Sequence, residues 1–599
     1  MLLGKHINAY YKRYWYLFVL GVIALIAVDY VQLFEPIYLG QIVDHLSGES
    51  GQVDIGLIGA ICLKLLGIAA VMFLGRMLWR FTLFNASQRV EAGVRREMFQ
   101  KSERLSQKYY HATNVGSIMS WFTTDLETIE EYMGFGTVQI VDAMFLGLLV
   151  IARMFALDWV MTLFALIPMM LIVVWGALVE KFMAQRWEDR QKKYDRMYDF
   201  VQENFTGISV IKAFVKETSE LHAFAKVARK NREANIAFVR VQIVFDTLIE
   251  VIIAVILSFI LGFGAWFVYA TVQGAPIVLF GHAIDLSAGR LITFIGYFDT
   301  LIWPMIALGS LVSMRGRAKA SLGRISAFLD AEETVQNPEH AEVLENLQGE
   351  IRFDHCSFAY PAQPDMPVLK DVSLLIHPGE LIGVVGRIGC GKTTLLTLLL
   401  RLYNVEEGTV FIDGHDIMHA DIDSLRRAVA FVPQDNFLFS DTIANNIGFS
   451  IDHPTIGKVI RAAEFADVAA NIEDFPNGYE TVTGERGVTL SGGQKQRISL
   501  ARAYLKDAPI LVLDDSVSAV DMRTEEKILQ NIREQRKGRT TIIIASRISS
   551  VAHADRILVL NDGAVEAFDT PEQLLKNSPT YSRMAYLQEL EREVKGGDA

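Results

Sequence analysis

The chain has 599 residues, of which 51% are hydrophobic and 21% charged, and its mean hydropathy is +0.26. Soluble chains of this length do not keep a positive mean hydropathy, so the composition indicates a membrane-embedded part. The net charge of −12 argues against a nucleic-acid partner, which would require a basic face. The three cysteines lie far apart, have no metal-ligand spacing and are typical of free thiols in a reducing compartment.

The apolar runs all lie before Arg315 and predict six membrane-spanning helices. Each run is long enough to cross a hydrocarbon core of about 30 Å, which takes roughly 20 helical residues. The expected spans are Tyr14–Leu33, Ile55–Trp79, Met133–Ala156, Val160–Val179, Phe245–Ala270 and Leu291–Ser313. We therefore expect a transmembrane domain over residues 1–315, a polar connector over 316–350 and a second domain over 351–599.

The charges between the apolar runs predict the orientation in the membrane. Segments Glu35–Asp54 and Thr271–Gly289 contain no Lys or Arg, whereas Asn85–Tyr132 and Lys181–Arg240 are rich in both. Basic segments stay on the cytoplasmic side of a membrane. We therefore expect the N-terminus, both long basic segments and everything after Arg315 to be cytoplasmic.

From residue 351 onward, short β-branched runs alternate with amphipathic helices and Gly/Asp turns. This alternation is typical of an α/β domain with a largely parallel sheet. The expected strands are Leu381–Val385, Ala430–Val432, Ile510–Leu513, Thr540–Ala545 and Arg556–Leu560.

Residues 386–393 match the pattern G-x-x-x-x-G-K-[ST] between a predicted strand and a predicted helix. Such a loop turns its backbone N–H groups toward phosphates at a helix N-terminus. We expect Lys392 to reach the β- and γ-phosphates, and Thr393 to bind Mg²⁺ together with Asp514 at the end of a buried strand. The remaining expected nucleotide-binding positions of this segment are Gly386, Gly389, Cys390, Gly391 and Thr394.

A second motif, Leu490-Ser491-Gly492-Gly493-Gln494, leads into another predicted helix. Its serine and glycines offer a second anion-binding helix start. A single chain rarely needs two phosphate-binding motifs for one nucleotide. Two chains that face each other do need both, because each nucleotide then lies between motifs from different chains.

With these motifs in this order, the chain resembles half-transporters of the ATP-binding cassette superfamily, of the six-helix exporter type, over nearly its whole length. The resemblance implies an α-helical six-span transmembrane domain fused to an α/β P-loop nucleotide-binding domain that uses ATP and Mg²⁺. It implies that Tyr360 stacks on adenine, that Gln434 contacts Mg²⁺ and the attacking water, and that Ser491 to Gln494 form the signature that closes on a partner's ATP. Further segments resemble the loop facing the partner's membrane domain, the D-loop and the two coupling loops: Gly484–Gly487, Ser518–Asp521, Lys108–Asp125 and Asn204–Glu217.

Two positions depart from this family pattern. Asp515 stands where the family has the glutamate that polarises the attacking water, and Ser546 stands where it has a histidine that contacts the γ-phosphate. An aspartate is one methylene shorter, and a misplacement of about 1 Å can cost of order a hundredfold in rate. A serine hydroxyl is too short to replace an imidazole and carries no positive charge. Neutral variation explains either change alone, but both together predict a site that binds ATP and hydrolyses it poorly.

The combined pattern resembles the degenerate-site subunit of heterodimeric bacterial multidrug exporters. It implies a second, non-identical half-transporter as partner, a location in the bacterial plasma membrane and hydrophobic small-molecule cargo. Two alternatives share these motifs: a regulatory ATP-binding subunit that gates a partner without dedicated transport, and an exporter of lipids or peptides.

Acidic residues within or near the apolar runs are candidates for a cargo cavity, because burying a charge in lipid is costly. The alternative for each of these residues is that it is solvated, because the helices extend beyond the membrane into the cytosol. The acidic positions are Asp29, Glu35, Asp142, Asp246, Glu250 and Asp299. We expect Asp142, Glu250, Asp299 and Trp303 to line the cavity, with Glu250 and Asp299 favoured for attracting cationic amphiphiles.

Overall fold

The structure is a computed structural model that describes residues 4–47, 55–484, 487, 490–516 and 520–596. The chain divides into two compact units. The first comprises Met1–Lys101 and Gly116–Asp330, and the second comprises Ser102–Val115 and Ala331–Ala599.

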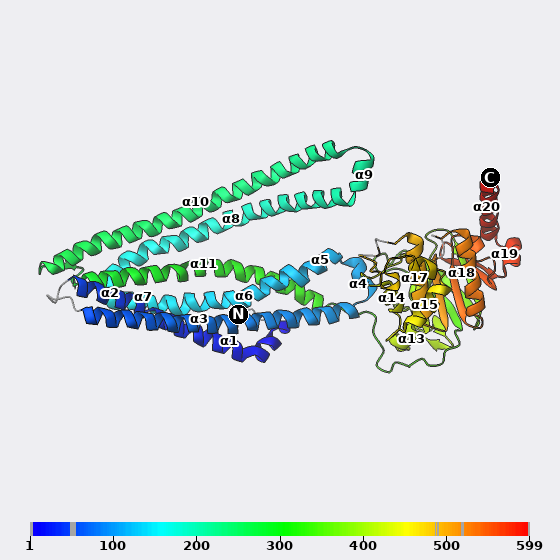
Figure 1. The fold of residues 1–599 in the computed structure, drawn as a ribbon, viewed down its shortest axis with the longest axis horizontal. Coiled ribbons are helices and arrows are strands. Elements are labelled where there is room, and N and C mark those ends of the chain that lie inside the picture. The colour runs from blue at the N-terminus through cyan, green and yellow to red at the C-terminus, as the bar shows by residue number, and fades with distance from the viewer. Residues whose placement is uncertain (1–3, 48–54, 485–486, 488–489, 517–519, 597–599) are drawn as a thin grey trace. The chain divides into compact units, whose positions relative to one another are not determined.

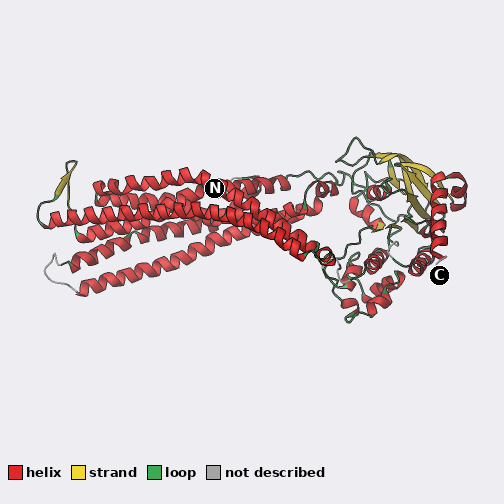
Figure 2. Ribbon diagram, turned by 90° about the horizontal axis from the view of Figure 1, so that it is seen from above, coloured by secondary structure: helices red, strands yellow, loops and turns green. Residues whose placement is uncertain are grey.

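The first unit is built from long helices and one short hairpin (Figures 1 and 2). The strands of the hairpin, β1 and β2, pair antiparallel. The elements are α1 (Lys5–Gln32), α2 (Phe34–Leu46), α3 (Ile55–Arg104), α5 (Val115–Ser120), π-helix η1 (Trp121–Asp125), α6 (Leu126–Val141), π-helix η2 (Asp142–Leu146), α7 (Gly147–Leu157), α8 (Trp159–Thr206), α9 (Ile208–Ala213), α10 (Glu217–Val272), β1 (Ile277–Leu279), β2 (His282–Ile284) and α11 (Ala288–Leu329).

Polar side chains mark where the long helices begin. Asp158 precedes α8 and accepts a hydrogen bond from the Met161 N–H at 2.9 Å, and Ser287 precedes α11 and accepts one from Arg290 at 3.1 Å. Such caps satisfy N–H groups that the first helical turn leaves unpaired. Helix α8 runs beside α10, and the short helix α9 joins their ends (Figure 1).

Five helical stretches of the described chain are long and apolar enough to cross a membrane. They are Lys5–Leu46, Ile55–Arg104, Val115–Leu157, Glu217–Val272 and Ala288–Leu329. The remaining expected span, Val160–Val179, lies within α8, whose described apolar stretch is the shorter Trp159–Met170. The predicted count of six is therefore not reached by these criteria, although all six predicted segments are helical apart from the turn at Leu33.

Helix α11 provides much of the apolar core of the first unit. It packs against α2, α6, α7 and η2. Phe294, Tyr297, Phe298 and Leu301, four of its side chains, are at most 1% exposed. The Tyr297 hydroxyl donates to the Leu33 carbonyl at 3.1 Å, at the break between α1 and α2. This bond ties α11 to the junction of α1 and α2.

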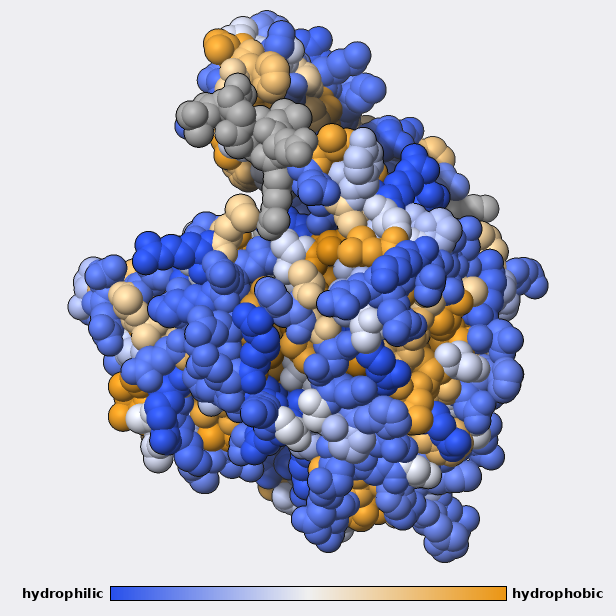
Figure 3. Space-filling view, turned by 90° about the vertical axis from the view of Figure 1, so that its right-hand side faces the viewer, coloured by the Kyte–Doolittle hydropathy of each residue, from blue (hydrophilic) through white to orange (hydrophobic). Residues whose placement is uncertain are grey.

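The second unit is an α/β fold with two sheets, and its strands gather together in Figure 2. The face of this unit seen in Figure 3 is mostly hydrophilic, with apolar patches between the polar side chains. The elements are α4 (Gln107–Ala112), β3 (Ile351–Phe358), β4 (Leu369–Ile376), β5 (Leu381–Gly386), α12 (Lys392–Leu399), β6 (Val410–Ile412), β7 (His415–Asp416), α13 (Ile422–Ala428), β8 (Val429–Val432), α14 (Ile443–Gly448), α15 (Ile456–Phe465), α16 (Ala469–Glu473), 3-10 helix η3 (Gly478–Glu480), α17 (Gly492–Leu505), β9 (Ile510–Asp514), α18 (Met522–Gln535), β10 (Thr540–Ile544), 3-10 helix η5 (Ile548–Ser550), β11 (Arg556–Asn561), β12 (Ala564–Asp569), α19 (Pro571–Asn577) and α20 (Pro579–Gly596).

The larger sheet has the strand order β12-β11-β5-β10-β9-β8. Its strands are parallel except for β12, which pairs antiparallel with β11. All five predicted strands are present in this sheet as β5, β8, β9, β10 and β11, so that expectation is confirmed. Strands β9 and β10 are buried along their whole length, as expected for a sheet covered on both faces.

The smaller sheet, β4-β3-β6-β7, is antiparallel and was not expected from the sequence. Strand β3 alternates between buried and exposed positions, which is typical of a strand with one face on the core. Its apolar side chains pack beneath the phosphate-loop helix in one cluster that includes Phe353, Leu374, Leu395 and Leu399.

Candidate functional site

One edge of the larger sheet collects the predicted nucleotide-site residues. Strands β5, β10, β9 and β8 run parallel, so their carboxyl ends lie at the same edge. Ile544 of β10 is in register with both Asp514 of β9 and Val384 of β5. The phosphate loop, the two aspartates and Ser546 therefore follow strands that end side by side. Ligands of open α/β sheets bind at such edges.

The phosphate loop leaves β5 at Gly386 and enters α12 at Lys392. A Cβ at Gly386 would lie 2.3 Å from the Leu560 carbonyl oxygen, so only glycine fits there. Gly391 precedes α12 with a φ of +99°, a conformation that favours glycine. The Lys392 ammonium donates to the carbonyls of Gly386 and Arg387 at 2.9 and 3.0 Å, so the loop curls around the lysine.

The other residues of the phosphate loop contribute main-chain groups or leave open space beside the loop. Gly389 faces open space, since a Cβ there would meet nothing within 4 Å. Cys390 is 5% exposed, and burial raises the pKa of its thiol, so its side chain fills the interior while its backbone belongs to the loop. Thr394 is buried, and its Oγ1 lies 3.0 Å from the Tyr360 hydroxyl oxygen.

Asp514 and Thr393 have the chemistry of a Mg²⁺ site. Asp514 is 2% exposed and is hydrogen-bonded to Thr393. Burial raises the pKa of this carboxyl, and the hydrogen bond from Thr393 opposes part of the rise. Its Oδ2 atom is buried and has no hydrogen-bond partner within the described part of the chain. A carboxylate and a hydroxyl are ligands that Mg²⁺ accepts, so these two residues fit the ion that the phosphate loop implies.

Asp515 and Ser546 contact each other directly. The Ser546 hydroxyl donates to Asp515 Oδ2 at 3.1 Å. Asp515 adopts a φ of +46°, and its N–H donates to the Ile544 carbonyl at 3.0 Å. Its carbonyl accepts a 3.0 Å hydrogen bond from the buried amide of Gln496. The Asp515 main chain is thus held from both β10 and α17.

Tyr360 lies in a cluster of aromatic rings. Its ring is edge-on to Tyr403 at 5.4 Å between centroids, and Phe358 contacts both. The hydroxyl of Tyr403 is hydrogen-bonded to His111 Nδ1 at 2.8 Å. His111 belongs to α4, the short helix inside the first predicted coupling loop. The packing leaves Tyr360 half-buried and fixes its ring, as a base-stacking residue requires.

The signature motif forms the N-terminus of α17. Ser491 and Gln494 make reciprocal side-chain to backbone hydrogen bonds, at 3.3 Å to the Ser491 oxygen and 2.9 Å to the Gln494 oxygen. This capping box satisfies N–H groups at the start of the helix. Gly492 and Gly493 form its first turn and stay partly accessible.

Two further predicted residues lie at loop ends. Asp521 caps α18 by accepting from the Thr524 N–H at 3.0 Å, and that hydrogen bond lowers the pKa of the Asp521 carboxyl. Gln434 follows β8 with an exposed side chain. Parts of the predicted loops Gly484–Gly487 and Ser518–Asp521 lie outside the described residues.

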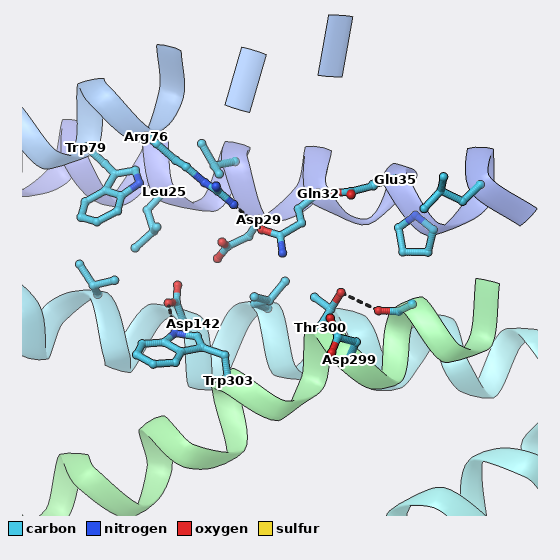
Figure 4. Close-up of a pocket in the computed structure, with 16 residues that line it drawn as sticks. Leu25, Asp29, Gln32, Glu35, Arg76, Trp79, Asp142, Asp299, Thr300 and Trp303 are labelled. Carbon is cyan, nitrogen blue, oxygen red and sulfur yellow. Dashed lines mark hydrogen bonds between the residues drawn. The ribbon is translucent and has the colours of Figure 1, made fainter. Parts of the chain in front are cut away.

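The first unit contains a cavity of about 500 Å³ between α1, α2, α3, α6, η2 and α11 (Figure 4). Asp142, Asp299 and Trp303, three of the residues expected in a cargo cavity, line it together. Glu250 lies on α10 with an exposed side chain and is not among the lining residues. The lining also includes Asp29, Glu35, Arg76 and Trp79.

Several residues that build these sites were not singled out from the sequence. Tyr403, His111 and Gln496 act through contacts with segments distant in sequence, which the motifs near His111 and Gln496 do not reveal. The spacing Ser491-x-x-Gln494 does match a capping box, so that signal was available. Arg76 and Trp79 lie within a predicted membrane span. The charge of the one and the aromatic ring of the other were the only features in the sequence that could have marked them as cavity residues.

Comparison with known families agrees with this geometry. Residues 18–305 match the family described as ABC transporter transmembrane region, and residues 369–518 match the family described as ABC transporter.

Individual relatives align over almost the whole chain. A probable multidrug resistance ABC transporter ATP-binding/permease protein, YheI of Bacillus subtilis, is 32% identical over 99% of this chain and 99% of its own length. The multidrug resistance-like ATP-binding protein MdlA of Escherichia coli is 34% identical over 99% of this chain and 97% of its own. The solved structure of a bacterial Atm1-family ABC exporter with ATP bound superposes with a TM-score of 0.77 at 25% identity, covering 97% of this chain and 99% of that one. The chain therefore belongs to the ABC transporter family, as an exporter half-transporter that joins one transmembrane domain to one ATP-binding domain.

Proposed function

We propose that this chain is one subunit of an ATP-driven exporter of hydrophobic or amphipathic compounds, and that its own ATP site binds nucleotide but hydrolyses it slowly. The names of its multidrug-type relatives support the cargo class. The observation that carries the slow site is the pairing of Ser546 with Asp515.

The binding half of the site has the groups that ATP and Mg²⁺ need. Lys392 supplies the cation of the phosphate loop, Tyr360 an aromatic face for the base, and Asp514 with Thr393 the ligands for Mg²⁺. Bound Mg²⁺ neutralises charge on the phosphates.

The two side chains at the hydrolytic positions are too short to activate an attacking water well. The Asp515 carboxylate accepts a hydrogen bond from Ser546, which engages one of the oxygens that would otherwise face a water. Neither side chain replaces a longer glutamate or an imidazole, because each is shorter than the group it stands for. The position of Gln434 at the end of β8 suits a contact to the water, but it does not supply a general base.

The complete signature supports a half-transporter as partner, and the proposed slow site of this chain favours a partner that is not identical to it. The capping box presents Ser491 and two accessible glycines at a helix start, as needed to close on another chain's ATP. In this proposal the partner carries glutamate and histidine at the positions of Asp515 and Ser546, and turnover occurs at the site that this chain's signature completes.

The proposal has a direct test in the ATPase rates of the purified chain alone and of the chain co-expressed with a half-transporter that carries glutamate and histidine at the positions of Asp515 and Ser546. We expect slow turnover alone and fast turnover together. In the pair, Lys392→Ala should reduce the rate less than the equivalent change in the partner. Fast turnover by this chain alone would contradict the slow site, and equal effects of the two lysine changes would contradict the division of roles.

Vesicle uptake of a fluorescent cation by the reconstituted pair with ATP distinguishes transport from a purely regulatory role. Uptake that requires ATP supports the exporter. Nucleotide binding and partner ATPase without uptake would favour the regulatory subunit, and uptake of a fluorescent phospholipid or peptide alone would favour those cargo classes.

We further propose six spans, with the N-terminus and the ATP-binding domain in the cytoplasm. The basic segments around α9 and the absence of Lys and Arg from Thr271–Gly289 support this orientation. A cysteine at Val278, which is 61% exposed on β1, should react with an impermeant thiol reagent in intact cells. A cysteine at Lys212 on α9 should react only after lysis, and the reverse pattern would overturn the orientation.

A further inference from the structure

The membrane cavity is bounded by irregular helix segments. Helix α1 ends at Gln32 beside it, and Asp142 opens the π-helix η2. Pro304 lies inside α11 next to Trp303, where it removes one backbone N–H donor from the helix. A π-helical turn inside an α-helix is frequent at functional sites, since it redirects side chains that a regular helix would space evenly. Two walls of this cavity thus deviate from a regular α-helix near its polar side chains, and the third lacks one backbone donor beside Trp303.

The lining of the cavity is strongly acidic. It contains four carboxylates, from Asp29, Glu35, Asp142 and Asp299, and one guanidinium, from Arg76. The Arg76 guanidinium donates to the Gln32 side chain at 3.4 Å. One cation cannot balance four carboxylates, so the cavity has a net preference for positive charge.

Two of these carboxylates are buried and incompletely hydrogen-bonded. Asp29 is 3% exposed and Asp142 is 7% exposed. Asp29 Oδ2 and Asp142 Oδ1 have no hydrogen-bond partner among the residues that the structure describes. Figure 4 shows the two side chains pointing toward one another from facing helices. Asp142 Oδ2 accepts from the Trp303 indole at 2.8 Å, which fixes the orientation of that carboxylate.

A third buried polar atom, the indole Nε1 of Trp79, also has no partner within the described chain. Trp79 is 9% exposed and lines the same cavity. The cavity therefore presents two acceptors that need N–H donors and one donor that needs an acceptor. Buried polar groups left without partners are costly, and hydrogen bonds to charged groups are the stronger ones.

We propose that this cavity is a binding site for a protonated amine that also carries a hydrogen-bond acceptor, with Asp29 and Asp142 receiving the N–H groups and Trp79 donating to the acceptor. A quaternary ammonium has the same charge but no N–H, so it leaves both carboxylate oxygens unpaired. The site thus selects on N–H donors and not on positive charge alone. A volume of about 500 Å³ suits a drug-sized ligand. The inference rests on the proposed export of amphipathic cargo for its purpose, but the binding site is independent of transport.

The test is equilibrium binding to the purified full-length chain in nanodiscs without nucleotide. The probe is dansylcadaverine, which has a primary ammonium, a sulfonamide acceptor and an environment-sensitive fluorophore. Its N,N,N-trimethyl derivative keeps the charge and its N-acetyl derivative removes it, and empty nanodiscs correct for partition into lipid. We expect the ammonium to bind at least about tenfold more tightly than either derivative, since both lose hydrogen bonds to a charged group.

Substitutions of the cavity residues test whether the probe binds in this cavity. Asp29→Asn and Asp142→Asn should each weaken the ammonium by about tenfold or more and remove most of its advantage over the trimethyl derivative. Trp79→Phe keeps a ring and should weaken binding by about threefold, the value of one neutral hydrogen bond. Glu250→Gln removes a carboxylate outside the cavity and should change nothing.

Equal binding of the ammonium and trimethyl probes to the unmodified chain would overturn the proposal, whether or not the variants fold. Unchanged affinity in folded Asp29→Asn and Asp142→Asn would also overturn it. ATP-driven uptake of the same probe into vesicles is measured separately: lost uptake with intact binding contradicts export and leaves the site standing.

Discussion

The Ser546 hydroxyl donates a 3.1 Å hydrogen bond to Asp515 Oδ2, so the two residues that depart from the family pattern contact each other. They lie at the ends of the adjacent parallel strands β9 and β10. In the proposed slow site, this shorter carboxylate and small hydroxyl take the places of the expected glutamate and histidine and form one local arrangement.

Replacing both residues should create a hydrolytic site. The double variant Asp515→Glu/Ser546→His extends the carboxylate by one methylene and supplies an imidazole. We expect the ATPase rate of the chain alone to rise by of order a hundredfold. The control is the same double variant with Lys392→Ala, which should return to background because the phosphate-loop cation is gone. An unchanged rate, with ATP binding retained, would show that another feature limits turnover.

Mg²⁺ binding should depend on pH through Asp514. Burial raises the pKa of this carboxyl, so it takes up a proton at higher pH than an exposed aspartate does. The protonated form cannot bind Mg²⁺, so protons compete with the metal as pH falls. The affinity for Mg·ATP should therefore decrease on acidification earlier than the affinity for ATP measured in EDTA. Asp514→Asn should remove the difference between the two pH profiles, and parallel profiles in the unmodified chain would contradict the role of Asp514.

Tyr403 should link α4 to the aromatic residue expected to stack on adenine. Tyr403→Phe removes the hydroxyl bonded to His111 but keeps the ring against Tyr360, so it should cost about 1 kcal/mol of stability and leave ATP affinity unchanged. Tyr403→Ala also removes the ring, which should cost about 3–5 kcal/mol and weaken ATP binding because Tyr360 loses its support. Thermal unfolding and nucleotide titration measure the two effects. If His111→Ala did not match Tyr403→Phe, the hydrogen bond would not be the relevant contact.

The capping box of α17 should contribute to stability independently of any partner. Ser491→Ala removes the acceptor for the Gln494 N–H and should destabilise the helix start by about 0.5–2 kcal/mol. Ser491→Asn keeps a side-chain oxygen at the cap and should stay near the unmodified chain. Hydrogen exchange in the first turn of α17 reads out the difference. Equal protection in all three proteins would mean that neighbouring contacts hold this turn without the cap.

Local patterns were sufficient for the phosphate loop and for the strands of the parallel sheet. Gly386 to Thr393 form a strand-to-helix turn, and the spacing of the glycines and Lys392 within this one segment was enough to predict it. The long apolar runs were likewise enough to predict helices, because a bilayer imposes length and composition on each helix by itself. The capping box could also have been predicted from two residues three positions apart.

Contacts between distant segments could not be predicted in this way. Asp29 and Asp142 were each visible as acidic residues in apolar runs, but only the packing of α1 against η2 turns them toward the same cavity and excludes Glu250 from it. In the same way, Asp515 and Ser546 could be recognised one by one, while their hydrogen bond depends on the register of β9 with β10. The sequence by itself determined which chemical groups this protein has and on which elements they lie. The tertiary structure decided which of them meet, because the packing of elements far apart in the chain sets the distances over which hydrogen bonds and charges act.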